Sequence, residues 1–148
     1  MTPREFSADS VLAKLEHLSE LLDVLEGTRD DLSLERVQRD AVLRLAVERI
    51  VTQLVELAAS ANAHIAATIG KTQASGSYRQ SFVMMGSLGI IPTDLAARLA
   101  LSAGMRNIMV HSYGEIDWEL VLASIPGFDA DYRAYVAHLS RWLADTVV

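Results

Sequence analysis

The chain has 148 residues, which suffices for one domain with a hydrophobic core of its own, and 51% of them are hydrophobic. It contains no cysteine, so disulfides, thiolate zinc sites and cysteine nucleophiles are excluded. Its net charge of −6 argues against a protein that coats nucleic acid, because broad phosphate contact requires a basic surface.

The first half of the chain predicts two helices, because apolar side chains recur there at three- and four-residue spacing. The first helix is expected over residues 7–26, and a polar break with Gly27 and two aspartates follows it. Ser33 has the side chain of an N-cap for a second helix over residues 34–69.

Neither proline nor glycine interrupts this second helix before residue 70. Charges of alternating sign at four-residue spacing predict a solvated stripe along it, formed by Arg36, Asp40, Arg44 and Glu48. A straight helix of this length would extend about 50 Å, more than a compact small domain needs. We therefore expect that it kinks or packs partly against a second subunit, which its small residues at 58–63 would allow to approach closely.

The second half predicts further helices separated by glycine and proline. After a loop over residues 70–77, a helix over residues 78–88 should stop at Gly89, because glycine favours helix ends. Pro92 should open the next helix, which is expected to end within residues 111–114.

Proline also divides the last part of the predicted structure. A short turn of helix after Asp117 is expected to stop at Pro126 and Gly127, because proline breaks helices. The final helix should then run from Asp129 to the C-terminus.

No alternating apolar pattern competes with the helical one, so we expect a single all-α domain over residues 1–148. The predicted architecture is an up-and-down four-helix bundle with additional short helices. The longest uncharged runs are shorter than the roughly 18 to 20 apolar residues of a membrane-spanning helix. No apolar signal-peptide core follows the N-terminus. A cytoplasmic protein without a membrane partner is therefore expected.

One short run concentrates polar chemistry in this apolar sequence: Arg106, Asn107, His111 and Tyr113. Arginine holds phosphoryl groups in its planar fork, and histidine transfers protons near neutral pH. Together the two side chains suffice to cut RNA without a metal. Between residues 71 and 110 four basic residues face a single acidic one, so a local phosphate site is compatible with the acidic chain.

The spacing of Arg106 and His111 sets a geometric condition. Residues five apart on a helix point about 140° away from each other. The two side chains can converge only if the helix ends between them or if a second subunit supplies partner residues. At a two-fold axis, two arginines and two histidines would meet, and we therefore expect a homodimer.

Residues 104–117, which contain this run, resemble the signature of HEPN-domain proteins of the HepT toxin family. In that signature a histidine follows an arginine by four to six residues, often with a polar residue after the arginine and a tyrosine two beyond the histidine. Residues 46–65, which include Glu56, resemble the family's second helix, and residues 77–92 resemble its middle. The likeness covers roughly residues 41–118 in the family's order and spacing.

The resemblance implies a HEPN-type bundle and a metal-independent endoribonuclease toxin of a type VII-like toxin–antitoxin system. It implies that Arg106 and His111 are the catalytic pair, that Asn107 supports them, and that the protein acts on RNA as a homodimer or higher homo-oligomer. The implied partner is a nucleotidyltransferase antitoxin that transfers AMP from ATP to Tyr113. The added negative charge would lie where the RNA phosphate must bind. No metal or other cofactor is expected apart from this covalent AMP.

Other interpretations stay open at this point. Arg106 and His111 also fit a helix-end ion pair or a histidine beside the helix dipole, and Tyr113 fits a half-buried packing residue. Glu48 and Arg49 predict an intrahelical or intersubunit salt bridge, and the orientation of Arg106 is a second interpretation of this pair. The alternative function is a catalytically silent helical partner that binds and regulates a nucleotidyltransferase. A third is a nucleotide-binding helical module unrelated to RNA.

Overall fold

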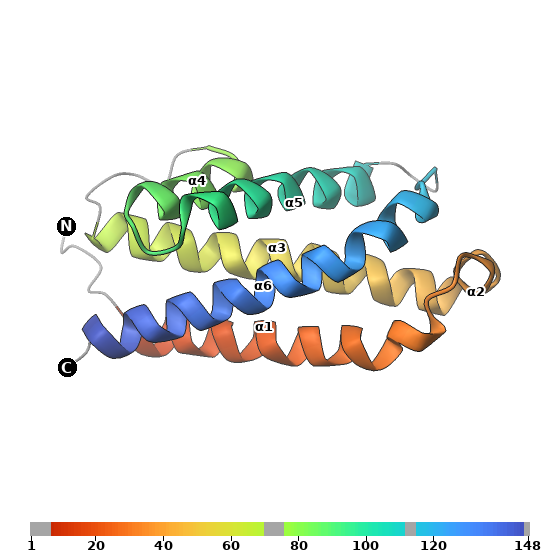
Figure 1. Ribbon diagram of the computed structural model, residues 1–148, viewed down its shortest axis with the longest axis horizontal. Coiled ribbons are helices and arrows are strands. Elements are labelled where there is room, and N and C mark those ends of the chain that lie inside the picture. The colour runs from red at the N-terminus through yellow and green to blue at the C-terminus, as the bar shows by residue number, and fades with distance from the viewer. Residues whose placement is uncertain (1–6, 70–75, 112–114, 147–148) are drawn as a thin grey trace.

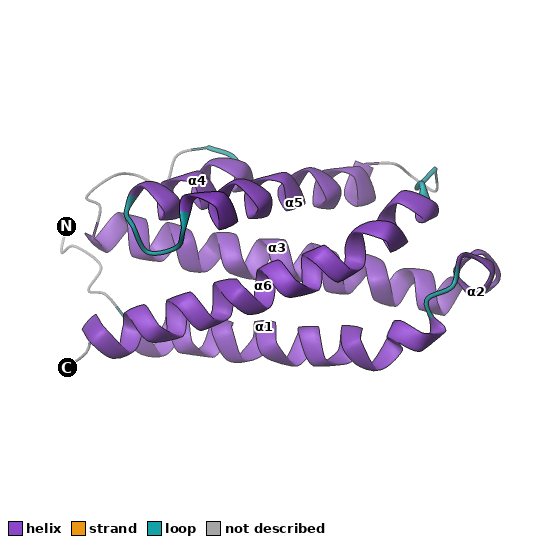
Figure 2. Cartoon of the chain, viewed as in Figure 1, coloured by secondary structure: helices purple, strands orange, loops and turns teal. Residues whose placement is uncertain are grey.

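The computed structural model describes residues 7–69, 76–111 and 115–146, and every regular element in these ranges is helical (Figure 2). The elements are α1 (Ala8–Thr28), a 3₁₀ turn (Arg29–Asp31), α2 (Leu34–Arg39), α3 (Ala41–Ile69), α4 (Tyr78–Ser87), α5 (Thr93–His111) and α6 (Trp118–Thr146). The all-α prediction is confirmed. No helix of the described ranges is long and apolar enough to cross a membrane.

Four long helices, α1, α3, α5 and α6, run alternately in opposite directions and form the bundle (Figure 1). Each packs against two of the others, because α1 contacts α3 and α6 while α5 contacts the same two helices. The short helix α4 lies against α3 and α5. A methyl group at Gly86 of α4 would come within 2.8 Å of the Ala96 side chain of α5, so this glycine permits the close approach of the two helices.

The core is built from the apolar stripes that the sequence predicts, with an aromatic cluster of Phe82, Tyr132 and Tyr135 at its centre. The phenol of Tyr135 donates to the backbone oxygen of Ala58 at 3.1 Å and to Oδ1 of Asn62 at 2.6 Å. Asn62 is only 1% exposed. Burial raises the pKa of Tyr132 and of Tyr135 well above the ordinary value for tyrosine.

The predicted helix ends at Ser33 and Gly89 are confirmed. The Ser33 hydroxyl accepts from the backbone N–H of Arg36, and Gly89 has a φ of 73°, a conformation that glycine adopts without strain.

The prediction of one helix over residues 34–69 is wrong, because the chain breaks at Asp40. Asp40 has extended dihedrals, and its carboxylate accepts from the backbone N–H of Leu43, so it caps the first turn of α3. Arg44 donates to the backbone oxygens of Val37 and Gln38 and so closes the end of α2. Asp40 and Arg44 of the predicted charge stripe thus form hydrogen bonds with backbone groups at helix ends. The chain breaks at this cap although the apolar pattern of the sequence continues through it.

The predicted break at Pro126 is also wrong, since α6 continues through it from Trp118 to Thr146. Apolar side chains on both sides of the proline, among them Ile125 and Phe128, are buried at helical spacing. Pro126 itself is exposed, and it removes one backbone hydrogen bond from the helix. Packing of the continuous apolar face therefore holds the helix together across the proline.

Candidate functional site

Helix α5 carries both residues of the predicted catalytic pair and runs uninterrupted from Thr93 to His111. The helix therefore ends at His111 and not between His111 and Arg106. On one helix the two side chains diverge by about 140° and their positions lie about 7.5 Å apart along the axis. The first of the two conditions under which the two side chains could converge, a helix end between them, is therefore not met.

Arg106 lies at the inner side of α5, with its side chain 17% exposed. Its Nη2 donates to Oε1 of Glu56 on α3 at 2.9 Å. Its guanidinium carbon lies 4.9 Å from the centre of the Tyr78 ring at the start of α4. An acidic group and an aromatic face from two other helices therefore fix the position of this cation.

The guanidinium keeps hydrogen-bonding capacity for an anion. It has five N–H donors, of which one on Nη2 bonds Glu56 and one on Nη1 donates to Oδ1 of Asn107 at 3.3 Å. The Nε atom is buried and has no hydrogen-bond partner among the described residues. Asn107 is exposed beside this group.

His111 is the last residue of α5 and is exposed. His111 takes no part in the ion pair of Arg106. That pair is made with Glu56 of α3 and not with a group at the end of α5. Tyr113, the predicted modification site, lies outside the described residues.

Sequence reasoning missed the partners that hold Arg106. Glu56 lies 50 positions before Arg106, and no spacing rule connects the two. The expectation that Glu48 and Arg49 would orient Arg106 is wrong, since the acidic partner is Glu56 two turns further along α3. Only the family resemblance at residues 46–65 drew attention to Glu56.

A cavity of about 270 Å³ adjoins this arrangement between α3 and α4. It is lined by Glu56, Ala59, Ser60 and Ala63 of α3 and by Gly76, Ser77, Tyr78, Gln80, Ser81 and Met84. Two of these residues, Glu56 and Tyr78, are also the contacts of Arg106. The small residues at 58–63, which were predicted to receive a second subunit, lie in two different environments. Some of them line this cavity, while Ala58 and Ala61 are buried in the chain's own core.

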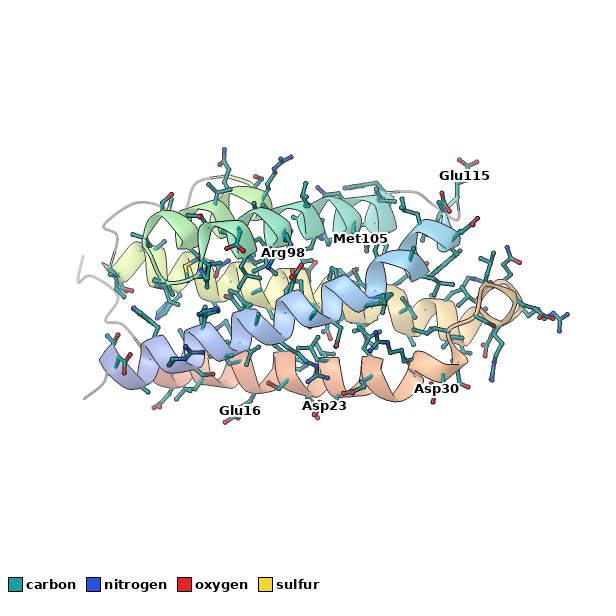
Figure 3. All side chains as sticks on the ribbon, in the orientation of Figure 1. Glu16, Asp23, Asp30, Arg98, Met105 and Glu115 are labelled. Carbon is teal, nitrogen blue, oxygen red and sulfur yellow. The ribbon has the colours of Figure 1, made fainter. Side chains whose placement is uncertain are left out.

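Acidic side chains lie on more than one part of the surface, and Figure 3 labels Glu115 close to the end of α5. Glu16 and Asp23 of α1 and Asp30 of the following turn project along the edge of the molecule opposite α5 in the view of Figure 3. In the same view Arg98 and Met105 point from α5 toward α6. In the described ranges no three histidine, aspartate or glutamate side chains gather as metal ligands.

The family model described as "Ribonuclease HepT-like" matches residues 14–138. A tRNA nuclease HepT of Aphanizomenon flos-aquae is 29% identical over 132 residues, which cover 88% of this chain and 87% of that protein. Two solved structures superpose with a TM-score of 0.80 at 20% identity, covering 90% of this chain and 98% of theirs. One is a toxin–antitoxin complex with AMP-PNP, and the other is a tri-AMPylated HEPN toxin of Shewanella oneidensis in complex with its MNT antitoxin.

Proposed function

Because the chain belongs to the family of HepT-like ribonucleases and has the HEPN fold, we propose that it is a toxin that cleaves RNA through Arg106 and His111. The observation that carries this proposal is the environment of Arg106. Its guanidinium is oriented from two sides by Glu56 and Tyr78 and still has donors for a phosphate. The same helix presents an exposed histidine at its end.

The proposed chemistry needs two proton-transfer groups. One histidine removes the proton of the ribose 2′-hydroxyl, whose oxygen attacks the phosphorus atom. The bond from phosphorus to the 5′-oxygen breaks, and a second histidine protonates that oxygen. The products are a 2′,3′-cyclic phosphate and a free 5′-hydroxyl. Arg106 stabilises the negative charge that grows on the phosphoryl oxygens, and no step uses a metal ion.

We infer that the second histidine comes from a second copy of the chain. Within one α5 helix the directions of Arg106 and His111 diverge, so one copy cannot place both on a single phosphate. A two-fold axis beside the end of α5 would bring two of each together. The homodimer is thus a requirement of the proposed mechanism.

The proposed regulator is a nucleotidyltransferase antitoxin that modifies Tyr113. The phenol oxygen would attack the α-phosphorus of ATP, the phenolic proton would be lost, and pyrophosphate would leave. AMP attached two residues beyond His111 would place a negative phosphodiester where the RNA phosphate must bind. Support comes from the position of this tyrosine directly after α5.

Cleavage of RNA in EDTA by four proteins tests the proposal. We expect cleavage by the wild type and by the control Arg141→Ala, whose arginine is exposed on α6 far along the chain from the site. Arg106→Ala and His111→Ala should be at least about 100-fold slower. Equal rates for all four proteins would overturn the assignment. Absence of cleavage together with a stable nucleotidyltransferase complex would favour the catalytically silent partner.

A further inference from the structure

The cavity between α3 and α4 adjoins Arg106, and the proposed mechanism leaves it unused. It shares Glu56 and Tyr78 with the surroundings of Arg106, so a group inside it would lie next to the group that Arg106 holds. Its volume of about 270 Å³ suits one flat heterocycle and is too small for a helix of another protein.

The lining combines apolar and polar groups, as small-molecule pockets generally do. Ala59, Ala63 and Met84 supply apolar surface, and the Tyr78 ring adds an aromatic edge or face. The polar groups are the Gln80 amide, which can donate and accept, and the Glu56 carboxylate. Arg106 occupies Oε1 of Glu56, so Oε2 remains as an acceptor.

Buried hydrogen bonds hold one wall of the cavity in place. The Ser81 hydroxyl donates to the backbone oxygen of Tyr78 at 2.7 Å and accepts from Nδ2 of Asn62 at 3.3 Å. Asn62 in turn accepts from Tyr135 in the core of α6 at 2.6 Å. The first turn of α4 is thus tied to the interior of the bundle, which makes the cavity a preorganised site.

We propose that this cavity, here called the base pocket (Glu56, Ala63, Tyr78, Gln80 and Met84), binds one unstacked nucleobase of the RNA substrate beside the phosphate held by Arg106. This inference rests on the proposed ribonuclease function. Proteins read single-stranded RNA by splaying bases onto aromatic side chains and hydrogen-bonding their edges. The carboxylate acceptor favours a base with an exocyclic amino group over uracil.

The test uses a single-stranded RNA that the wild type cleaves at one bond. Each nucleotide around that bond is replaced in turn by an abasic residue. We expect kcat/KM of the wild type to fall about 10- to 100-fold at one position, the loss that follows from removing one stacked base. Replacing the base at that position by uracil should give a smaller loss in the same direction.

Two variants tie that position to the base pocket. Ala63→Leu fills the cavity, so it should cleave intact RNA about 10- to 100-fold more slowly and no longer respond to the abasic residue. The matched control Ala67→Leu adds the same side chain one turn further along α3 at an exposed position outside the cavity, and it should behave as wild type. Gln80→Ala, a substitution at an exposed position, should weaken the preference at the same nucleotide.

Binding of the same RNA series to His111→Ala keeps the two proposals separable, because binding requires no cleavage. If the wild type cleaves but no abasic position matters, or if Ala63→Leu responds as wild type does, the base pocket is wrong and the ribonuclease stands. If the wild type does not cleave and affinity still falls at one abasic position, only the catalytic proposal fails. A change of oligomeric mass in Ala63→Leu with equal loss on every substrate would make the cavity a protein interface and overturn the inference.

Discussion

The substitution Glu56→Gln tests whether Arg106 must be oriented by Glu56 to act, because it leaves Arg106 itself in place. The glutamine keeps the size of the side chain and one acceptor oxygen but removes the negative charge that faces Nη2 at 2.9 Å. Arg106 is 17% exposed and Glu56 37% exposed, so this ion pair lies between a surface pair and a buried one. Surface pairs contribute about 0–1 kcal/mol, and hydrogen bonds to charged groups about 1.5–3 kcal/mol.

We therefore expect Glu56→Gln to lower the free energy of unfolding by about 1–2 kcal/mol. The effect on catalysis should be larger, because a guanidinium misplaced by about 1 Å can cost on the order of 100-fold in rate. The expected result is a kcat about 10- to 100-fold lower.

Urea unfolding and steady-state cleavage of RNA, measured on the same preparations, check both values. Glu35→Gln is the control, because it removes an equally short but exposed ion pair with Arg39 and should leave stability and kcat almost unchanged. A folded Glu56→Gln protein with the kcat of the wild type would refute the view that Glu56 positions Arg106. Rescue of kcat by Glu56→Asp would not be expected, because the shorter side chain does not span the distance.

Three further predictions concern the fold. Asp40→Ala removes the cap of α3 and should cost about 1 kcal/mol in urea unfolding, whereas an unchanged midpoint would show that the break at this residue has another cause. Pro126→Ala should stabilise the protein by about 1–3 kcal/mol, because α6 is already helical there, and a loss of stability would contradict the continuous helix. The free energy of unfolding should fall as the pH rises above about 10. Tyrosines of the unfolded chain ionise there, whereas burial keeps the pKa of Tyr132 and Tyr135 raised in the folded protein. The folded state therefore retains protons that the unfolded state releases. Tyr132→Phe should flatten this decline between pH 10 and 11, and an identical decline in both proteins would contradict it.

Local chemistry explains which parts of the fold were predictable. The apolar spacing of α1 and the serine cap at Ser33 are read directly from neighbouring residues, and both are confirmed. The two wrong predictions involve a competition between a local signal and packing. At Asp40 the capping side chain prevails over an uninterrupted pattern, and at Pro126 the buried apolar face prevails over the helix breaker.

The site divides in a similar way. The residue types of Arg106 and His111 predict phosphate binding and proton transfer, and their spacing predicts that the two side chains diverge on one helix. The contacts that orient Arg106 come from α3 and α4, far away in sequence, so only the folded chain brings Glu56 and Tyr78 to it. The base pocket exists for the same reason, since it is formed by the packing of two helices and by no motif.

In the proposed mechanism two copies of the chain share the histidines of one RNA-cleaving site, and a subunit-mixing experiment tests this sharing. A fixed amount of wild type is allowed to exchange subunits with an equal amount of His111→Ala, and the cleavage rate is measured in EDTA. We expect the rate to fall to about half, because half of the wild-type chains then have a partner without His111, and to fall further with excess variant. Arg141→Ala as the diluent should not lower the rate. A rate that stays constant as His111→Ala is added, or a wild type that cleaves no RNA, would contradict the account.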